Sequence, residues 1–362
     1  MKTFGVLVLL CVFATGALAA GLKVPGTYAT IQAAVDAAVD GDVIKVSAGT
    51  YVENVSVNGK TGITIKRVGG GQVVVDAGGT GTPLTIEGGS TNILVSNLTL
   101  QNSADSSGVV IMFSSDIHLE GCKVLDVAFD GVGVLLTFNV WITNCSIKNV
   151  GLHGIELVTA DCVISGNTIK NAVECGVLVV GERNTVDSNV IKSTGFAGIQ
   201  LGDSPATCED SLVLENTIRE SLDGIYVDAT AIDCSILDNT IKEPLSDGIE
   251  VQSLAVGHVI DGNTVKKPGD SGFELDALNL RVTRNKVKKS VDDGFFIQWN
   301  AAECLLYGNI AKKCADDGFQ VDGTDNSLVG NTATGSGDFD LQDANPAGSN
   351  AYVDNTFGSI GP

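Results

Sequence analysis

Four carboxylates in the second half of the chain recur at spacings that place them on neighbouring units of a repeat: Asp228, Glu250, Glu274 and Asp276. Enzymes that hydrolyse glycosidic bonds use two carboxyl groups, about 5 Å apart for retention of configuration and about 6.5–9.5 Å apart for inversion. Stacked coils of a β-structure lie about 4.8 Å apart, so neighbouring coils would hold these groups at such separations. Acid–base catalysis is one interpretation of these residues, and a solvated acidic surface is the other.

Aromatic and amide side chains occupy the same repeat positions or the turns beside them. A sugar ring offers an apolar face to an aromatic ring and hydroxyl groups to amides and carboxylates. The residues that we predict to bind a substrate are Tyr226, Gln252, Phe296, Gln298, Trp299, Gln320 and Asp322. Arg and Lys are absent from these repeat positions, so lyase chemistry on an acidic polysaccharide fits less well than glycoside hydrolysis.

Two Asp-Asp pairs precede glycines of the repeat, Asp292-Asp293 and Asp316-Asp317. On adjacent coils they would bring four carboxylates together, and the mutual repulsion would favour a hard cation with oxygen ligands. Calcium is therefore the one cofactor that the sequence suggests. Asp-Gly is also ordinary turn chemistry, which needs no metal.

These positions belong to a repeat of 22 to 27 residues. Its glycines are Gly131, Gly154, Gly176, Gly198, Gly224, Gly248, Gly272, Gly294 and Gly318, and its asparagines run from Asn144 and Asn167 to Asn331. Segments such as 248–252 alternate apolar and polar residues, as strands do, and a unit this short suits three strands and three turns. We predict an all-β fold, a right-handed single-stranded parallel β-helix in which equivalent residues stack in rows along the axis.

Three other rows follow from the same register. The asparagines would hydrogen-bond along the axis and support the fold. Basic residues form a row on a different face: Lys148, Lys170, Lys192, Arg219, Lys242, Lys266, Lys288 and Lys312. This row is either a solvated surface neutralised by acids such as Glu220 and Glu243, or a surface for an anionic polymer. Cys122 and Cys145 fall at the same outward position of adjacent coils, which predicts a disulfide.

The two ends differ from the repeat. Residues 1–19 combine a basic start, a short apolar run and Ala17-Leu18-Ala19, which predicts a signal peptide and a secreted protein. Residues 20–362 would form one β-helix domain, with a helix-containing cap and entry coil at 22–60 and an irregular end at 336–362. No later segment is apolar enough for membrane insertion. The net charge of −21 argues against nucleic acid and anionic lipid as partners.

The segment from Tyr28 to Val55, YATIQAAVDAAVDGDVIKVSAGTYVENV, resembles the entry segment of the pectin-lyase-like right-handed parallel β-helix superfamily. The Gly-Ile and Gly-Asn-Thr-Ile units are similar to its repeats, including those of NosD-like and carbohydrate-binding or sugar-hydrolase proteins. The resemblance covers essentially the whole mature chain and implies the fold. The catalytic motifs of several members are missing, among them the Asp-Pro-His of mannuronan epimerases, so the resemblance implies no particular reaction.

Two functions of different class remain open. The first is a secreted protein that binds a polysaccharide along the acidic and aromatic face and, if it is an enzyme, acts as a glycoside hydrolase or polysaccharide lyase. The second is a non-catalytic structural or adhesive protein of the cell surface, whose rows only maintain the fold. Short turns favour the second function, and the aromatic residues together with the resemblance favour the first.

Overall fold

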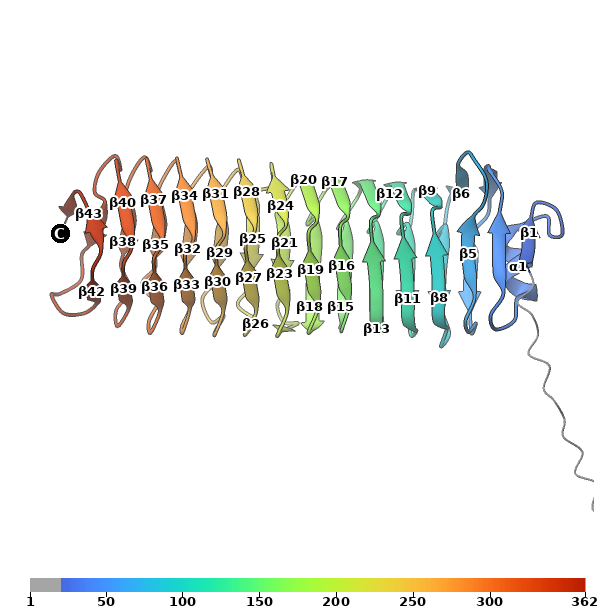
Figure 1. Cartoon of the computed structure of the whole chain (residues 1–362), viewed down its shortest axis with the longest axis horizontal. Helices are drawn as coiled ribbons and strands as arrows, with labels where there is room; N and C mark the ends of the chain where they lie inside the picture. The colour runs from blue at the N-terminus through green and yellow to red at the C-terminus, as the bar shows by residue number, and fades with distance from the viewer. Residues whose placement is uncertain (1–20, 362) are drawn as a thin grey trace, which may run out of the picture.

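Short parallel strands wind into stacked coils along the computed structural model, which describes residues 21–361 (Figure 1). The coils follow one another in sequence order from the blue N-terminal end to the red C-terminal end, so neighbours in space are neighbouring repeats. The predicted signal peptide at 1–19 lies outside the described residues. The repeat therefore builds the predicted parallel β-helix, because each strand pairs with the equivalent strand of the next coil.

Each coil contributes strands to three faces. Face 1 contains β4 (Val55–Asn58), β7 (Leu84–Glu87), β10 (Val109–Met112), the first part of β13 (Val132–Thr143), β15 (Ile155–Ala160), β18 (Val177–Glu182), β21 (Ala197–Leu201), β25 (Asp223–Val227), β29 (Ile249–Val251), β32 (Phe273–Leu275), β35 (Phe295–Ile297), β38 (Phe319–Val321), β41 (Leu341–Asp343) and β44 (Ile360–Gly361). Face 2 contains β1 (Gly21–Val24), β2 (Val43–Val46), β5 (Thr64–Arg67), β8 (Thr91–Ser96), β11 (Ser115–Glu120), the second part of β13, β16 (Val163–Ser165), β19 (Thr185–Asp187), β23 (Leu212–Leu214), β27 (Ser235–Leu237), β30 (Val259–Asp261), β33 (Arg281–Thr283), β36 (Leu305–Tyr307), β39 (Ser327–Val329) and β42 (Ala351–Val353). Face 3 contains β3 (Gly49–Val52), β6 (Val73–Gly79), β9 (Thr99–Ser103), β12 (Lys123–Val127), β14 (Ser146–Val150), β17 (Thr168–Ala172), β20 (Val190–Thr194), β24 (Thr217–Arg219), β28 (Thr240–Lys242), β31 (Thr264–Lys266), β34 (Lys286–Lys288), β37 (Ile310–Lys312), β40 (Thr332–Thr334) and β43 (Thr356–Phe357). Two short strands, β22 (Cys208–Glu209) and β26 (Ala231–Ile232), pair between faces 1 and 2.

Apolar residues that alternate with polar ones along each strand fill the interior of the coils. On face 1, Phe273, Phe295 and Phe319 are fully buried. Their rings stack with centroids 4.7 Å apart in both neighbouring pairs and interplanar angles of 9° and 7°. This spacing matches the distance between paired strands, so one register fixes both the backbone ladder and the core.

The repeat glycines are required by close packing and not by a left-handed backbone conformation. None of the nine repeat glycines has a positive φ. A Cβ at Gly224, Gly248 or Gly272 would overlap the backbone oxygen of the next repeat glycine and a valine or isoleucine side chain from face 3. The chain therefore passes the corner between faces 3 and 1 where no side chain fits.

The predicted asparagine ladder is present and buried. From Asn189 to Asn331, each side-chain Oδ1 accepts the backbone N–H and the Nδ2–H of the preceding asparagine, as between Asn216 and Asn239 at 2.9 and 3.0 Å. Asn144 is an exception to the predicted register, because the neighbouring Cys145 donates its N–H to Asn167 Oδ1 at 2.8 Å. Cys145 thus stands where later coils have asparagine.

The cysteine register was predicted correctly, but the cysteine environment was not. Cys122 and Cys145 lie on adjacent coils and point into the core, with 1% and 2% of their surface exposed. They are free thiols, as are the other cysteines among residues 21–361, so the predicted disulfide is not formed in this structure. Each thiol instead contacts a carbonyl oxygen of the preceding coil, Val95 O at 3.8 Å and Leu119 O at 3.5 Å.

The N-terminal cap agrees with the sequence. Helix α1 (Ile31–Ala37) begins after Thr30, whose side chain accepts the N–H of Ala33 at 3.1 Å. Glu53 accepts the N–H groups of Ile31 and Gln32, both at 2.9 Å, and so ties the helix to the next coil. Within residues 21–361, no helix is long and apolar enough to cross a membrane. At the other end, the segment predicted to be irregular from 336 carries four further strands, β41 to β44.

Candidate functional site

The two predicted outward rows lie on face 1. Tyr226, Glu250, Glu274, Phe296 and Gln320 are paired in register across β25, β29, β32, β35 and β38. The second row lies just beyond these strands: Asp228, Gln252, Asp276, Gln298 and Asp322. All of these side chains are half-buried. The repeat therefore brings the predicted catalytic and substrate-binding residues to one surface, and Trp299, in the turn after β35, is 73% exposed at its edge.

The four carboxylates predicted to be catalytic divide into two kinds. Asp228 accepts hydrogen bonds from the N–H and hydroxyl of Thr230, at 3.0 and 2.7 Å. Asp276 accepts the Nδ2–H of Asn300 at 3.0 Å and its backbone N–H at 3.3 Å. Both are thus held by the turns that follow the strands. Thr230 lies two residues after Asp228 in the same turn, whereas Asn300 belongs to the coil after that of Asp276, so both carboxylates already have donors.

Glu250 and Glu274 lie side by side on β29 and β32 and differ from the two aspartates. Burial, reinforced by the charges of Asp223 and Asp247, raises the pKa of Glu250 to about 7. Burial, together with the charge of Glu250, likewise raises the pKa of Glu274 to about 7. Their carboxylates accept hydrogen bonds from Gln252 and Gln298 respectively. Near neutral pH each group can therefore be either a proton donor or an acceptor.

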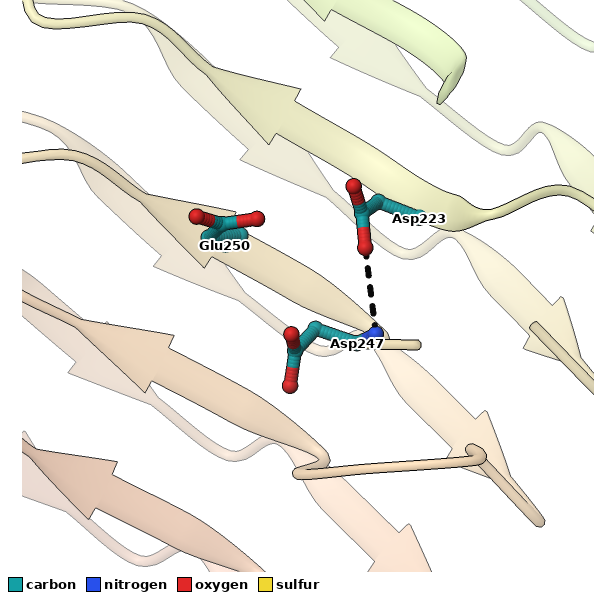
Figure 2. Close-up of side chains that lie close together, drawn as sticks. All are labelled: Asp223, Asp247 and Glu250. Atoms are coloured by element: carbon teal, nitrogen blue, oxygen red, sulfur yellow. Dashed lines mark hydrogen bonds between the residues drawn. The ribbon is translucent and has the colours of Figure 1, made fainter. Parts of the chain in front are cut away.

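Two further carboxylates, Asp223 and Asp247, lie beside Glu250. Figure 2 shows Asp223 and Asp247 on consecutive coils beside Glu250, and oxygens of the three groups lie within 4.8 Å of one another. Asp223 and Asp247 are each only 3% exposed. Burial raises the pKa of Asp247 to about 8, and the charge of Glu274 contributes to this shift. Both aspartates precede a repeat glycine, a position that the sequence had associated only with turns or calcium.

These aspartates belong to an inner row that caps the backbone at the corner between faces 3 and 1. The inner row consists of Asp223, Asp247, Asp293 and Asp317. Each Oδ1 accepts the N–H of the equivalent residue in the next coil, at 3.1, 2.9, 2.8 and 2.7 Å. The row thus has a structural role, and its buried charge helps to raise the pKa values of Glu250 and Glu274.

An outer row of aspartates is stacked beside the inner row. The outer row consists of Asp270, Asp292, Asp316 and Asp338, one position earlier in each coil. Backbone hydrogen bonds join its four members in turn, at 3.3, 3.4 and 3.1 Å. Oxygens of Asp292, Asp293 and Asp316 lie within 4.8 Å of one another, and so do those of Asp316, Asp317 and Asp338. The four residues predicted to bind a metal therefore lie together, and Asp338 joins them.

Face 1 also contains a hollow that the sequence did not identify. It measures about 540 Å³ and is lined by Leu152, His153, Glu174, Leu178, Phe196, Gln200, Asp203, Tyr226 and Asp228. Phe196 meets Tyr226 edge-on, with ring centroids 5.1 Å apart at 61°. Tyr226 thus stands where the hollow meets the carboxylate and amide rows.

A short loop after β21 forms one wall of this hollow. Asp203 and Ala206 exchange backbone hydrogen bonds at 3.1 and 2.7 Å, and the Thr230 hydroxyl contacts Ala206 O at 2.8 Å. This loop, residues 202–210, interrupts the repeat beside Tyr226. Three residues of the lining occupy the same position on consecutive coils, two residues before a repeat glycine: Leu152, Glu174 and Phe196. Backbone hydrogen bonds of 3.1 Å join each to the next.

The basic row lies on face 3, away from the carboxylates of face 1. Its register from Lys148 to Lys312 is as predicted. Lys192 of this row pairs with Glu220 at 3.1 Å, whereas Glu243 pairs with Lys267, the residue after the row's Lys266, at 2.7 Å. On face 1, the segments 223–228, 247–252, 271–276, 293–300 and 317–322 contain no Lys or Arg.

Stacked parallel coils with an outward surface of carboxylates, amides and aromatic rings define a β-helix protein with one extended polar and aromatic face. The chain belongs to the right-handed β-helix family, whose model matches residues 42–218 and 223–360. This match confirms the fold and its handedness. None of the curated protein sequences compared matches the chain.

Similar folds occur in solved structures of low sequence identity. The A-module of Azotobacter vinelandii mannuronan C-5 epimerase AlgE6 is 19% identical with a TM-score of 0.63, over 92% of this chain and 94% of that one. PfbA, a surface adhesin of Streptococcus pneumoniae, is 11% identical with a TM-score of 0.60, over 90% and 93%. The receptor-binding domain of the Siphovirus 9NA tailspike is 13% identical with a TM-score of 0.62, over 93% and 76%. At these identities the likeness concerns the fold.

Proposed function

We propose that the protein is secreted and binds an uncharged polysaccharide along face 1, from the hollow beside Phe196 and Tyr226 to the amides near Gln320. The observation that carries this proposal is the hollow, because its two contacting aromatic rings open directly onto paired carboxylates and amides. Aromatic rings suit the apolar faces of sugars, and the polar rows suit their hydroxyl groups.

Charge supports an uncharged ligand rather than an acidic one. The central strands of face 1 carry carboxylates and no Lys or Arg, and the whole chain has a net charge of −21. Burial lowers the pKa of His153 in the hollow, so its imidazole supplies no positive charge at neutral pH. An acidic polymer would meet repulsion on this face, whereas hydroxyl groups can donate to its carboxylates.

Binding can be tested with a panel of neutral and acidic polysaccharides in the presence of EDTA, followed by titration calorimetry on the best ligand. We expect Tyr226→Ala and Phe196→Ala to weaken binding by about tenfold or more, because each removes one wall of aromatic contact. Tyr307→Ala on face 2, where Tyr307 is 51% exposed, should bind normally. Failure of the wild-type protein to bind any member of the panel would favour a structural or adhesive surface protein instead.

Glycoside hydrolysis is a second candidate function, favoured by Glu250 and Glu274. They lie on adjacent strands, about 4.8 Å apart, which is close to the roughly 5 Å that retaining enzymes use. With pKa values of about 7, one can protonate the leaving glycosidic oxygen while the other, ionised, attacks the anomeric carbon. Water then releases the sugar from the carboxylate. The mechanism needs no group beyond these two residues and water.

Release of reducing ends from the bound polysaccharide would test this second function. Glu250→Gln and Glu274→Gln should each abolish product formation while changing the dissociation constant by no more than about threefold, since an amide keeps the hydrogen-bonding shape. Binding by the wild-type protein without any product would exclude hydrolysis of that polysaccharide and leave the binding function intact.

A further inference from the structure

Three aspartates near the C-terminal end of the β-helix, at the corner between faces 3 and 1, lie close enough together to bind a single metal ion. Asp316 and Asp338 belong to the outer row, and Asp317 belongs to the inner row. Oxygens of all three lie within 4.8 Å of one another. Calcium–oxygen bonds are about 2.4 Å long, so two oxygens on the same ion lie at most about 4.8 Å apart. The three carboxylates therefore satisfy the distance condition for one ion.

Asp317 provides an independent reason to expect an ion. Its Oδ1 accepts the N–H of Phe339 at 2.7 Å, but its Oδ2 is buried and has no hydrogen-bond partner. The residue is only 1% exposed. A buried carboxylate oxygen without a donor is costly, and native proteins satisfy such atoms with a donor, water or a cation.

No basic side chain neutralises this corner. The ion pairs found among residues 21–361 do not include Asp316, Asp317 or Asp338. On the preceding coil Asp292 and Asp293 add further carboxylates whose oxygens approach Asp316.

The similar cluster at Asp223, Asp247 and Glu250 differs in this respect. Asp247 accepts the hydroxyl of Ser246 at 3.0 Å, and Glu250 accepts the side chain of Gln252. Its members thus have protein donors, whereas Asp317 Oδ2 has none. The missing donor at Asp317 distinguishes its cluster from the cluster of Asp223, Asp247 and Glu250.

We propose that Asp316, Asp317 and Asp338 bind one Ca²⁺ ion, with water completing the shell on the exposed side. All three ligands are hard oxygen donors, which suit calcium better than softer metals. The ion joins two consecutive coils, since Asp316 and Asp317 come from one coil and Asp338 from the next. Its role is to fasten the C-terminal coils, and it is independent of the glycan proposed for face 1.

Calorimetric titration of EDTA-treated protein with CaCl₂ tests the proposal. We expect one Ca²⁺ per chain and a melting temperature that rises on adding Ca²⁺. Asp338→Asn, at an exposed position, should weaken binding by about tenfold or more because it removes a charged ligand. Asp325→Asn should bind Ca²⁺ normally, because Asp325 is exposed on the same coil as Asp316 but lies in the turn between faces 1 and 2.

The variant Asp317→Asn distinguishes a calcium ligand from an aspartate that only accepts a backbone hydrogen bond. The asparagine retains the oxygen that accepts from Phe339 and removes the uncompensated charge. We expect this variant to melt at or above the temperature of the calcium-free wild type and to gain nothing from added Ca²⁺. The proposal is overturned if the wild type takes up no Ca²⁺, or if Asp317→Asn and Asp338→Asn both bind it like the wild type.

Discussion

At the scale of the residue, the neighbours of a carboxylate decide what it can do. Asp228 and Glu250 occupy adjacent coils on one face, yet Asp228 is bound by Thr230 at 2.7 Å in its turn while Glu250 lies beside buried aspartates. The sequence identified both as candidates because it fixes only their row. The sequence does not show which turn residue, such as Thr230, will donate to a carboxylate, or that Asp223 and Asp247 will be buried beside Glu250. Both depend on how the corners fold.

Raised carboxyl pKa values make stability depend on pH in a direction opposite to the usual one. Between their ordinary values and about 7–8, Glu250, Glu274 and Asp247 hold more protons in the folded than in the unfolded chain. Their stabilisation is therefore present at mildly acidic pH and is lost as pH rises through 7–8. In EDTA, we expect the melting temperature to fall by roughly 5 °C between pH 5.5 and pH 8.5.

The double variant Glu250→Gln/Glu274→Gln isolates this contribution, because amides do not titrate. Its melting temperature should change clearly less over the same pH range, whereas Glu120→Gln, an exposed position at the end of β11, should behave as the wild type does. A wild-type melting temperature that rises with pH across this range would contradict the assigned environments of the two glutamates.

At the scale of the element, the period of the sequence predicts which residues share a row, but not the contacts across a corner. The rows of Glu250 and Lys148 were predicted because alternation fixes the outward side of a strand. The sequence did not predict that Cys145, rather than Asn144, occupies the ladder position, or that Cys122 points into the core. Alternation along a strand does not fix which residue points inward at a corner. Phe196 was missed because its position precedes the strand.

Close packing at the repeat glycines yields a direct prediction. Gly248→Ala should lower the free energy of unfolding by about 2–4 kcal/mol, because the added Cβ would overlap Gly272 O and the side chain of Val265. Gly70→Ala is the matched control, since a Cβ there meets nothing within 4 Å. Urea unfolding followed by circular dichroism measures both, and equal stability of the two variants would refute the packing explanation.

The asparagine ladder predicts a larger loss. Asn239→Ala removes two donors and an acceptor that bind Val213 O, Asn263 Oδ1 and the backbone and side chain of Asn216, at 2.9–3.0 Å. The buried partners stay unpaired, so we expect a loss of about 3–5 kcal/mol. Asn54→Ala removes one exposed bond to Thr80 O at 3.1 Å and should cost less than about 1 kcal/mol. Equal denaturation midpoints would mean that the ladder contributes no stability.

At the scale of the whole molecule, the β-helix separates opposite charges onto different faces. The basic row follows face 3, while the carboxylates, amides and aromatic rings follow face 1 for several coils. The fold class, the rows and the N-terminal cap could be predicted from the sequence, because a repeat propagates one local rule along the axis. The hollow beside Tyr226 could not, because it depends on one loop that interrupts the repeat.

The central claim is that face 1, rather than the basic row, contacts a glycan. Hydrogen–deuterium exchange with and without an oligosaccharide selected by the binding screen tests it most directly. The account predicts slower exchange in the loop at 202–210 and in the turns at 228–230 and 252–256, and unchanged exchange along face 3. Protection confined to the strands that carry Lys170, Lys192 and Arg219 would contradict the account and assign binding to the basic row.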